Sequence, residues 1–150
     1  MTGAASDALL DGFLGYHIKR ASNVIQADLA RTLKPFELRM ITLSALAVIA
    51  GNPGLRQADL AAALEIERPN LVAVVDKLQR RGLIVRERDA TDRRAHALSP
   101  TPAGRRLLAK ALAAVHEHEA RLFGDIDPNR IAGVADVMRS IRNAPRKPGQ

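Results

Sequence analysis

The sequence predicts a mainly α-helical chain with a single β-hairpin near its middle. Long segments repeat apolar residues at steps of three and four, the spacing that places them on one face of a helix. Only the region from 83 to 99 changes to the composition of strands, on both sides of a charged tip. Two short helical segments directly precede this hairpin. That order is typical of a winged helix-turn-helix, here with further helices on either side.

The length and composition fit one folded domain. The 150 residues are 47% hydrophobic and 26% charged, both near globular averages, so we treat residues 1–150 as a single unit. Neither a membrane span nor a signal peptide is apparent, so we expect a cytoplasmic protein without a membrane partner. Cysteine is absent, which excludes disulfides, thiolate metal sites and cysteine nucleophiles.

The charge balance favours a nucleic acid as the partner. Lysine and arginine number 23 against 16 acidic residues, a net charge of +7 that attracts polyanions over long range. Aromatic residues make up only 3% of the chain, too few for the stacking surfaces of single-strand and RNA binders. Duplex DNA is therefore the favoured partner. A general bias toward arginine is the alternative explanation of the charge.

The N-terminal third contains two helical segments. Residues 7–32 carry an apolar stripe at helical spacing and predict an amphipathic helix of about six turns. Pro35 interrupts this pattern. The next segment, 37–50, is apolar on nearly every face until the residues 51–54, Gly-Asn-Pro-Gly, end it. We expect the segment 37–50 to be the central buried helix.

Two short helices follow in the middle of the chain. An alanine-rich helix is predicted over 57–64, and after a brief spacer a second helix over 68–81. Pro69 suits the first turn of this second helix, where its missing N–H would have no partner. Gly82 suits the left-handed position that ends it.

The predicted hairpin places basic side chains beside the second short helix. Its strands are 83–88 and 95–99, around a polar tip at 89–94. Residues 68–94 hold eight basic and four acidic side chains, which is +4 of the net charge of +7. In a winged helix the second helix enters the major groove. Guanidinium groups on the hairpin tip suit the narrow, electronegative minor groove.

The outer helices predict a dimer. Helices are expected over 101–123 and 127–143, each with a proline in its first turn. The segments 7–34 and 101–143 carry more apolar surface than a DNA-binding lobe at 53–100 can cover within one copy of the chain. A homodimer would cover them, and its two-fold symmetry predicts an inverted-repeat operator with half-site centres about 10 base pairs apart. The alternative is a self-contained monomeric core.

The central residues resemble those of the MarR (multiple antibiotic resistance regulator) family. The similarity covers nearly the whole chain and depends on the combination of segments at these distances. The segments are QADLA at 57–61, LEIERPNLV at 64–72, VDKL at 75–78, RGLI at 81–84, DRR at 92–94 and LSPTPAG at 98–104. The resemblance implies a transcriptional regulator, most often a repressor, that binds duplex DNA as a homodimer.

The resemblance also implies which residues contact DNA. They are Arg56 and Gln57 before the first short helix, Arg68, Pro69, Asn70, Ala73 and Lys77 on the recognition helix, and Arg93 and Arg94 on the wing. Asn70 can pair with an adenine edge, and Arg68 with guanine or phosphate. Val72 and Ala73 occupy positions where the family often has a hydroxyl residue and an arginine. We therefore expect few direct hydrogen bonds from the recognition helix to base edges. We interpret Arg80, Arg81 and Arg86 as solvated surface charges.

Members of this family commonly bind a small anionic aromatic effector where the first two helices meet the DNA-binding lobe. The candidate residues here are Phe13, His17, Arg20, Val24, Arg39 and Leu43. Arg20 or Arg39 would hold a carboxylate, with the aromatic body against Phe13 and Leu43. Two alternatives stay open: Tyr16 and His17 pack at the dimer interface, or Arg20 and Arg39 pair with acidic neighbours.

Local similarity at Gly15-Tyr16-His17 and at 67–70 extends to members that sense hydroxycinnamic acids or their coenzyme A thioesters. In those members an anionic tail would compete with DNA for basic residues. The alternative function is a winged-helix regulator, or a protein-interaction module, without a small-molecule effector.

Catalysis is the least favoured function. Neither a glycine-rich phosphate loop nor a Gly-x-Ser-x-Gly or His-Glu-x-x-His motif occurs in the sequence. His116 and His118 are two apart on a helix and point to different faces, so they do not form a shared metal site. We therefore expect no catalytic residues, no metal site and no cofactor.

Overall fold

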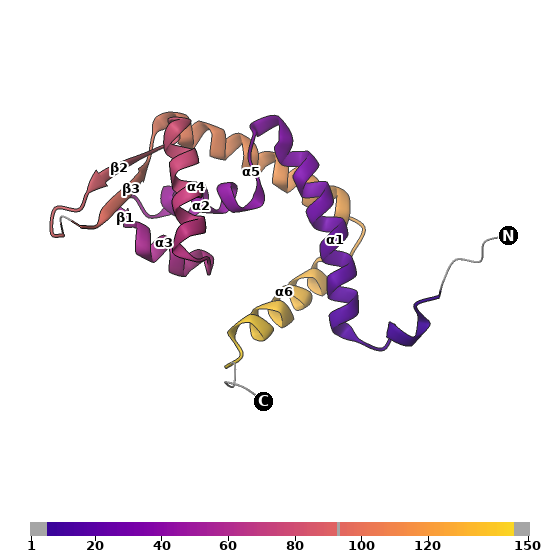
Figure 1. Ribbon diagram of the computed structural model, residues 1–150. Helices are drawn as coiled ribbons and strands as arrows, with labels where there is room; N and C mark the ends of the chain where they lie inside the picture. Colours follow the sequence, from indigo (N-terminus) through magenta and orange to yellow (C-terminus); the bar gives the residue numbers. More distant parts are fainter. Residues whose placement is uncertain (1–5, 93, 146–150) are drawn as a thin grey trace.

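The computed structural model describes residues 6–92 and 94–145 and confirms the mainly helical winged-helix architecture (Figure 1). The elements are η1 (Ala8–Leu10), α1 (Leu14–Leu33), η2 (Lys34–Phe36), α2 (Met40–Gly51), β1 (Leu55–Arg56), α3 (Gln57–Leu64), α4 (Arg68–Arg80), β2 (Ile84–Arg88), β3 (His96–Pro100), α5 (Pro102–Phe123) and α6 (Pro128–Asn143). The strands, α3 and α4 form one end of the molecule, and α6 lies toward the other (Figure 1). No helix in the described part of the chain is long and apolar enough to span a membrane.

The first two helices begin later than the apolar pattern predicts. The helix expected from residue 7 is divided into η1 and α1, because Phe13 has an extended backbone (φ −103°, ψ 115°). The helix expected from residue 37 begins at Met40, because Glu37 adopts the left-handed conformation (φ 52°) that ends η2. Side-chain periodicity carries no information on these backbone reversals, so the helix starts were wrong by several residues.

The wing belongs to a three-stranded antiparallel sheet in the order β1-β3-β2. The predicted hairpin is confirmed, with Ile84 opposite Pro100 and Arg88 opposite His96. β1 was not predicted, because a strand of two residues has no detectable alternation. It pairs with the other edge of β3, where Leu55 faces Leu98, and so joins the start of α3 to the base of the wing.

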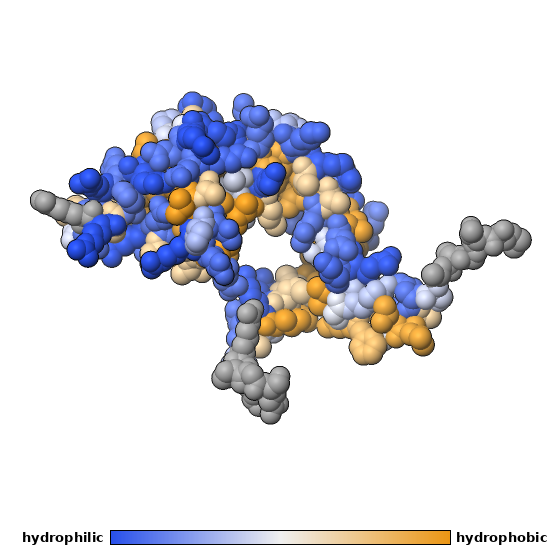
Figure 2. All heavy atoms as spheres, in the orientation of Figure 1, coloured by the Kyte–Doolittle hydropathy of each residue, from blue (hydrophilic) through white to orange (hydrophobic). Residues whose placement is uncertain are grey.

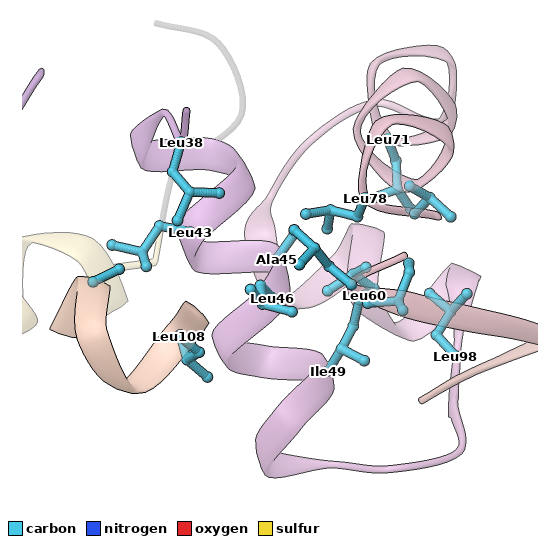
Figure 3. Packing of buried hydrophobic residues seen from close by; sticks show 14 of the residues in the cluster. Leu38, Leu43, Ala45, Leu46, Ile49, Leu60, Leu71, Leu78, Leu98 and Leu108 are labelled. Carbon is cyan, nitrogen blue, oxygen red and sulfur yellow. The ribbon is translucent and has the colours of Figure 1, made fainter. Parts of the chain in front are cut away.

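The predicted central helix, α2, forms the middle of the hydrophobic core. Its Ala45, Leu46 and Ile49 are fully buried. Figure 3 shows these side chains between leucines of α3, α4 and β3 on one side and Leu108 of α5 on the other. The core thus holds α4 and the wing in one fixed arrangement.

The helix α6 contributes no buried residue. Its Val134 and Ile141 side chains are 56% and 53% exposed, and Phe13 before α1 is 63% exposed. Figure 2 shows apolar surface beside α6 and at the N-terminal end of the described chain. A single copy therefore leaves part of the predicted outer stripes uncovered.

A carboxylate on α1 joins α1 to α5. His118, 1% exposed, places Nδ1 2.6 Å from Asp28 Oδ2, where it donates a hydrogen bond to the carboxylate. Arg31 donates to Asp28 Oδ1 at 2.8 Å, and Arg121 Nη2 lies 3.6 Å from Oδ2. The hydrogen bond from His118, followed by that from Arg31, lowers the pKa of Asp28 below its usual value. Sequence analysis had assigned His118 no role.

Replacing Asp28 with asparagine is expected to lower the Tm by several degrees at pH 7. Because the folded-state pKa lies below that of the unfolded chain, the stabilisation is fully present above the unfolded pKa of about 4 and is lost as pH falls through the folded pKa. The Tm difference between wild type and Asp28→Asn should therefore shrink below pH 4. Thermal unfolding followed by circular dichroism measures both.

The matched control is Asp136→Asn, which removes an exposed i,i+3 pair with Arg139 on α6. Exposed pairs of this kind contribute little to stability, so its Tm should stay near that of the wild type. A pH-independent difference for Asp28→Asn would contradict the assignment.

Candidate functional site

A groove of about 410 Å³ opens between α3, α4 and the wing. Its lining residues are Arg56, Gln57, Ala58, Arg68, Leu71, Val72, Asp92, Arg94, Ala95 and His96. Four predicted DNA contacts, Arg56, Gln57, Arg68 and Arg94, therefore meet in one groove although they come from three separate segments. Three of the lining residues are arginines and one, Asp92, is acidic, so the groove favours an anion.

The core determines which face of α4 reaches solvent. Leu71, Val75 and Leu78 lie on successive turns of α4 and are all buried, so their common face fixes the rotation of the helix about its axis. The opposite face is exposed and carries the remaining predicted contacts. These are Pro69, Asn70, Ala73 and Lys77, together with Arg68 at the start of the helix.

Arg56 binds the wing in the isolated chain. Its Nε donates to Asp89 Oδ2 at 2.8 Å and its Nη2 to Thr91 Oγ1 at 3.2 Å. Hydrogen bonds from the backbone and side chain of Thr91, followed by the one from Arg56, lower the pKa of Asp89 to about 2. The carboxylate is thus ionised at physiological pH, and Arg56 anchors the wing to β1. The predicted phosphate contact of Arg56 stays a prediction.

The tip of the wing is shaped by a second carboxylate. Asp92 Oδ1 accepts a hydrogen bond from the backbone N–H of Arg94 at 2.9 Å, which orients Arg94 as part of a tight turn. The Arg94 side chain is exposed. The other predicted wing contact, Arg93, lies outside the described residues.

Two arginines interpreted as solvated surface charges are instead partly buried and paired. Arg86 of β2 donates to Asp76 of α4 at 2.5 Å, with its side chain only 20% exposed. Arg81, just after α4, donates to the backbone carbonyl groups of Phe36 and Glu37. That interpretation was wrong for both residues, because their partners lie at distances along the chain that no local pattern reveals.

A larger cavity, of about 820 Å³, lies where α1, the segment 34–39 and α2 meet α4. The residues that line it are Gln26, Leu29, Ala30, Lys34, Glu37, Leu38, Arg39, Met40 and Lys77. Apolar side chains from α1, the segment 34–39 and α2 supply most of the wall. Lys34 and Arg39 approach from the segment 34–39 and Lys77 from α4, beside one lining carboxylate, Glu37. An apolar wall with convergent cations suits an amphipathic anion, and the volume is in the range of ordinary ligand sites.

Of the six predicted effector residues, only Arg39 lines this cavity. Leu43 is buried in the core, and Phe13 and Val24 are each 63% exposed. His17 Nε2 lies 2.7 Å from the carbonyl oxygen of Asp11. The single chain therefore does not bring the predicted set together.

Arg20 pairs with acidic and polar neighbours, which was one of the alternatives left open. Its Nη1 donates to Tyr16 Oη at 3.1 Å and lies 3.6 Å from Asp7 Oδ2, and Tyr16 donates to Asp7 in turn. The cavity is instead lined by Lys34 and Lys77. Lys34 was not among the predicted site residues, and Lys77 was predicted only as a DNA contact. No periodic signal marks either lysine as a cavity residue.

Comparison with known proteins places these features in a family. A model of the MarR family matches residues 38–95. A protein of Thauera aromatica, named for transcriptional regulation of an hcr operon, is 41% identical over 105 residues. That match covers 69% of this chain and 63% of the relative, so the chain spans less than two thirds of its length.

Two solved structures are similar over nearly the whole chain. The transcriptional repressor CouR, bound to a 23-mer DNA duplex, has a TM-score of 0.89 and 35% identity, covering 93% of this chain and 99% of that one. CouR from Rhodococcus jostii RHA1, bound to p-coumaroyl-CoA, has a TM-score of 0.79 and 30% identity, covering 92% and 97%.

Proposed function

The chain belongs to the MarR family of transcriptional regulators, which are DNA-binding proteins and not enzymes, and we propose that it represses transcription by binding an operator as a homodimer. The groove that gathers Arg56, Arg68 and Arg94 beside the exposed face of α4 carries this proposal. CouR, which is similar over 93% of the chain, is a repressor with a DNA-bound structure.

In the proposed complex α4 enters the major groove and the wing approaches the neighbouring minor groove. Asn70 and Arg68 are the side chains on α4 able to read base edges. Ala73 and Pro69 let the helix approach closely but offer no side-chain hydrogen bond. Gln57, Lys77 and Arg94 contribute contacts to the phosphates or the minor groove, so much of the affinity is electrostatic and depends on salt.

A second copy of the chain is the proposed cover for α6 and the exposed residues around Phe13. Two-fold pairing repeats α4 about one helical turn of DNA away, so the operator is an inverted repeat with half-site centres about 10 base pairs apart. Sedimentation of the purified protein as twice its chain mass of 16.2 kDa is the expected result.

The 820 Å³ cavity is the proposed effector site. Lys34, Arg39 and Lys77 attract an anion, and Leu29, Leu38 and Met40 offer apolar contact to an aromatic body. A hydroxycinnamic acid or its coenzyme A thioester has both parts, and CouR from Rhodococcus jostii RHA1 binds p-coumaroyl-CoA.

The contacts expected from Phe13, His17, Arg20, Val24 and Leu43 remain predictions. They would require the second subunit or a rearrangement of α1, because in the single chain these residues lie outside the cavity lining. The competing proposal is a MarR-type regulator without an effector, in which the cavity is filled by packing in the dimer.

Fluorescence anisotropy with a duplex from the DNA upstream of the gene tests both parts of the proposal. We expect tight binding at low salt and a Kd that rises by about tenfold or more with saturating p-coumaroyl-CoA, within the usual range of coupling between sites. Coenzyme A alone and p-coumarate alone are the controls. Failure to bind duplex DNA at low ionic strength would end the repressor proposal, whereas DNA binding that no ligand alters would favour the regulator without an effector.

A further inference from the structure

Arg81 connects the end of the recognition helix α4 to the wall of the effector cavity. Its Nη1 donates to the carbonyl oxygen of Glu37 at 2.8 Å, and its Nη2 donates to that of Phe36 at 2.9 Å. Nη2 also lies 3.8 Å from Glu37 Oε2, and the Arg81 side chain is 25% exposed. One guanidinium thus holds two successive carbonyl groups in a fork, a geometry that arginine provides and lysine does not.

The segment that Arg81 holds is part of the cavity itself. Lys34, Glu37, Leu38 and Arg39 all line the cavity, and they surround the sharp turn between η2 and α2. Glu37 has φ 52°, a left-handed conformation that is strained for a non-glycine residue. The last carbonyl groups of a helical turn also lack partners within it. Arg81 supplies those partners and so keeps a strained turn against α4.

The other end of the contact is the junction between α4 and the wing. Arg81 follows α4 directly, and the next residue, Gly82, has φ 68° and turns the chain toward β2. Thr101, which precedes α5, donates to the carbonyl oxygen of Gly82 at 2.6 Å. A displacement of Arg81 would therefore move α4 and the base of the wing together.

We propose that Arg81 is a positioning residue that couples occupation of the cavity to the orientation of the recognition helix. The proposal rests on the effector function proposed above and adds the route by which the effector acts. An anionic ligand that binds Lys34 and Arg39 shifts the turn at Glu37. Because Arg81 grips this turn at two carbonyl groups, α4 and the wing follow. The effector then favours a spacing of the two recognition helices that fits DNA less well.

A simpler route runs through Lys77, which lies both in the cavity lining and on the exposed face of α4. In that case the ligand would compete with DNA for one cation, and Arg81 would have only a structural role. The two routes differ in which substitution removes the coupling between ligand and DNA.

The test is the ratio of operator Kd values with and without saturating p-coumaroyl-CoA, measured for wild type, Arg81→Lys and Lys77→Gln. We expect a wild-type ratio of about tenfold or more, and a ratio within about twofold of one for Arg81→Lys. Affinity for DNA alone and affinity for p-coumaroyl-CoA alone should each change little in Arg81→Lys, because lysine preserves the charge near Glu37. The Tm should fall by a few degrees, because lysine cannot hold both carbonyl groups of the turn. Arg31→Lys is the matched control, since the Arg31 side chain is exposed and lysine can also pair with Asp28.

Three results would overturn the inference. The first is an Arg81→Lys ratio equal to that of the wild type, with or without a loss in Lys77→Gln. The second is a lower ratio accompanied by weaker binding of DNA alone, which would show that Arg81 only maintains the DNA-binding structure. The third is a ratio of one in the wild type, which refutes the effector function itself. This result is distinguishable from a failure of the Arg81 proposal because it appears without any substitution.

Discussion

Replacing Arg68 and Arg94 together with glutamine will weaken operator binding by at least about two orders of magnitude at moderate salt, because each charged hydrogen bond to DNA contributes about 1.5–3 kcal/mol and the proposed homodimer presents each arginine twice. The two side chains line the same groove from α4 and from the wing, and both are exposed. Glutamine keeps a polar side chain and removes only the charge. Because the proposed homodimer presents each arginine twice, removing four charged contacts should also lower the slope of log K against log salt by about three to four units.

Anisotropy titrations across a range of salt concentrations measure the affinity and the slope together. The control, Arg130→Gln with Arg142→Gln, removes the same charge from α6, which lies away from the winged helix (Figure 1). We expect it to change the affinity by no more than about twofold, as long-range screening requires. Equal losses in the two double variants would show that net charge, and not this groove, determines binding.

Replacing Gly104 with alanine should destabilise the protein by about 3 kcal/mol, or roughly 10 °C in Tm, the upper end of what overpacking costs in a chain of this size. A Cβ at this position would lie 2.0 Å from the carbonyl oxygen of Leu83 and 2.9 Å from its carbonyl carbon. Both obstacles are backbone atoms and cannot rotate away. That carbonyl also accepts the backbone N–H of Thr101 at 3.0 Å, so α5 begins directly on the base of the wing.

To accommodate the methyl group, α5 must move away from the junction of α4 and β2, and operator affinity should fall with the Tm. Gly51→Ala is the matched control, because no atom lies within 4 Å of its new Cβ at the end of α2. Its Tm should stay the same or rise slightly, since alanine favours a helix over glycine. An unchanged Tm in Gly104→Ala would mean that α5 and the wing do not pack as described.

The fold was predictable wherever the signal is local. The apolar face of α4 repeats at helical spacing in the sequence, and burial of that face leaves Asn70 and Lys77 exposed on the other side. The change to β propensity at Ile84 and Val85, followed by the charged tip, likewise predicted the wing. In both cases hydrophobic burial selects one face of one element, and the spacing of apolar residues a few positions apart shows which face it is.

The candidate site was predictable only in part. The groove brings together Arg56, Gln57, Arg68 and Arg94, four of the residues that the family resemblance assigned to DNA contacts. The cavity contains only Arg39 of the predicted effector residues. Arg20 occurs at a helical spacing that suggested a binding face, yet it pairs with Asp7 in the isolated chain. Periodicity predicts which face of a helix is apolar, but it does not predict which polar residue of another element lies opposite.

The sequence by itself determined the order of the main helices and the β-hairpin, the apolar faces of the amphipathic helices and the cationic character of the DNA-binding end. Tertiary structure alone decided that His118 meets Asp28, that Arg81 holds the turn at Glu37, and that Lys77 reaches the cavity. The physical reason is that apolar burial is a property of each segment, whereas a polar contact depends on two specific atoms that folding brings together from distant positions.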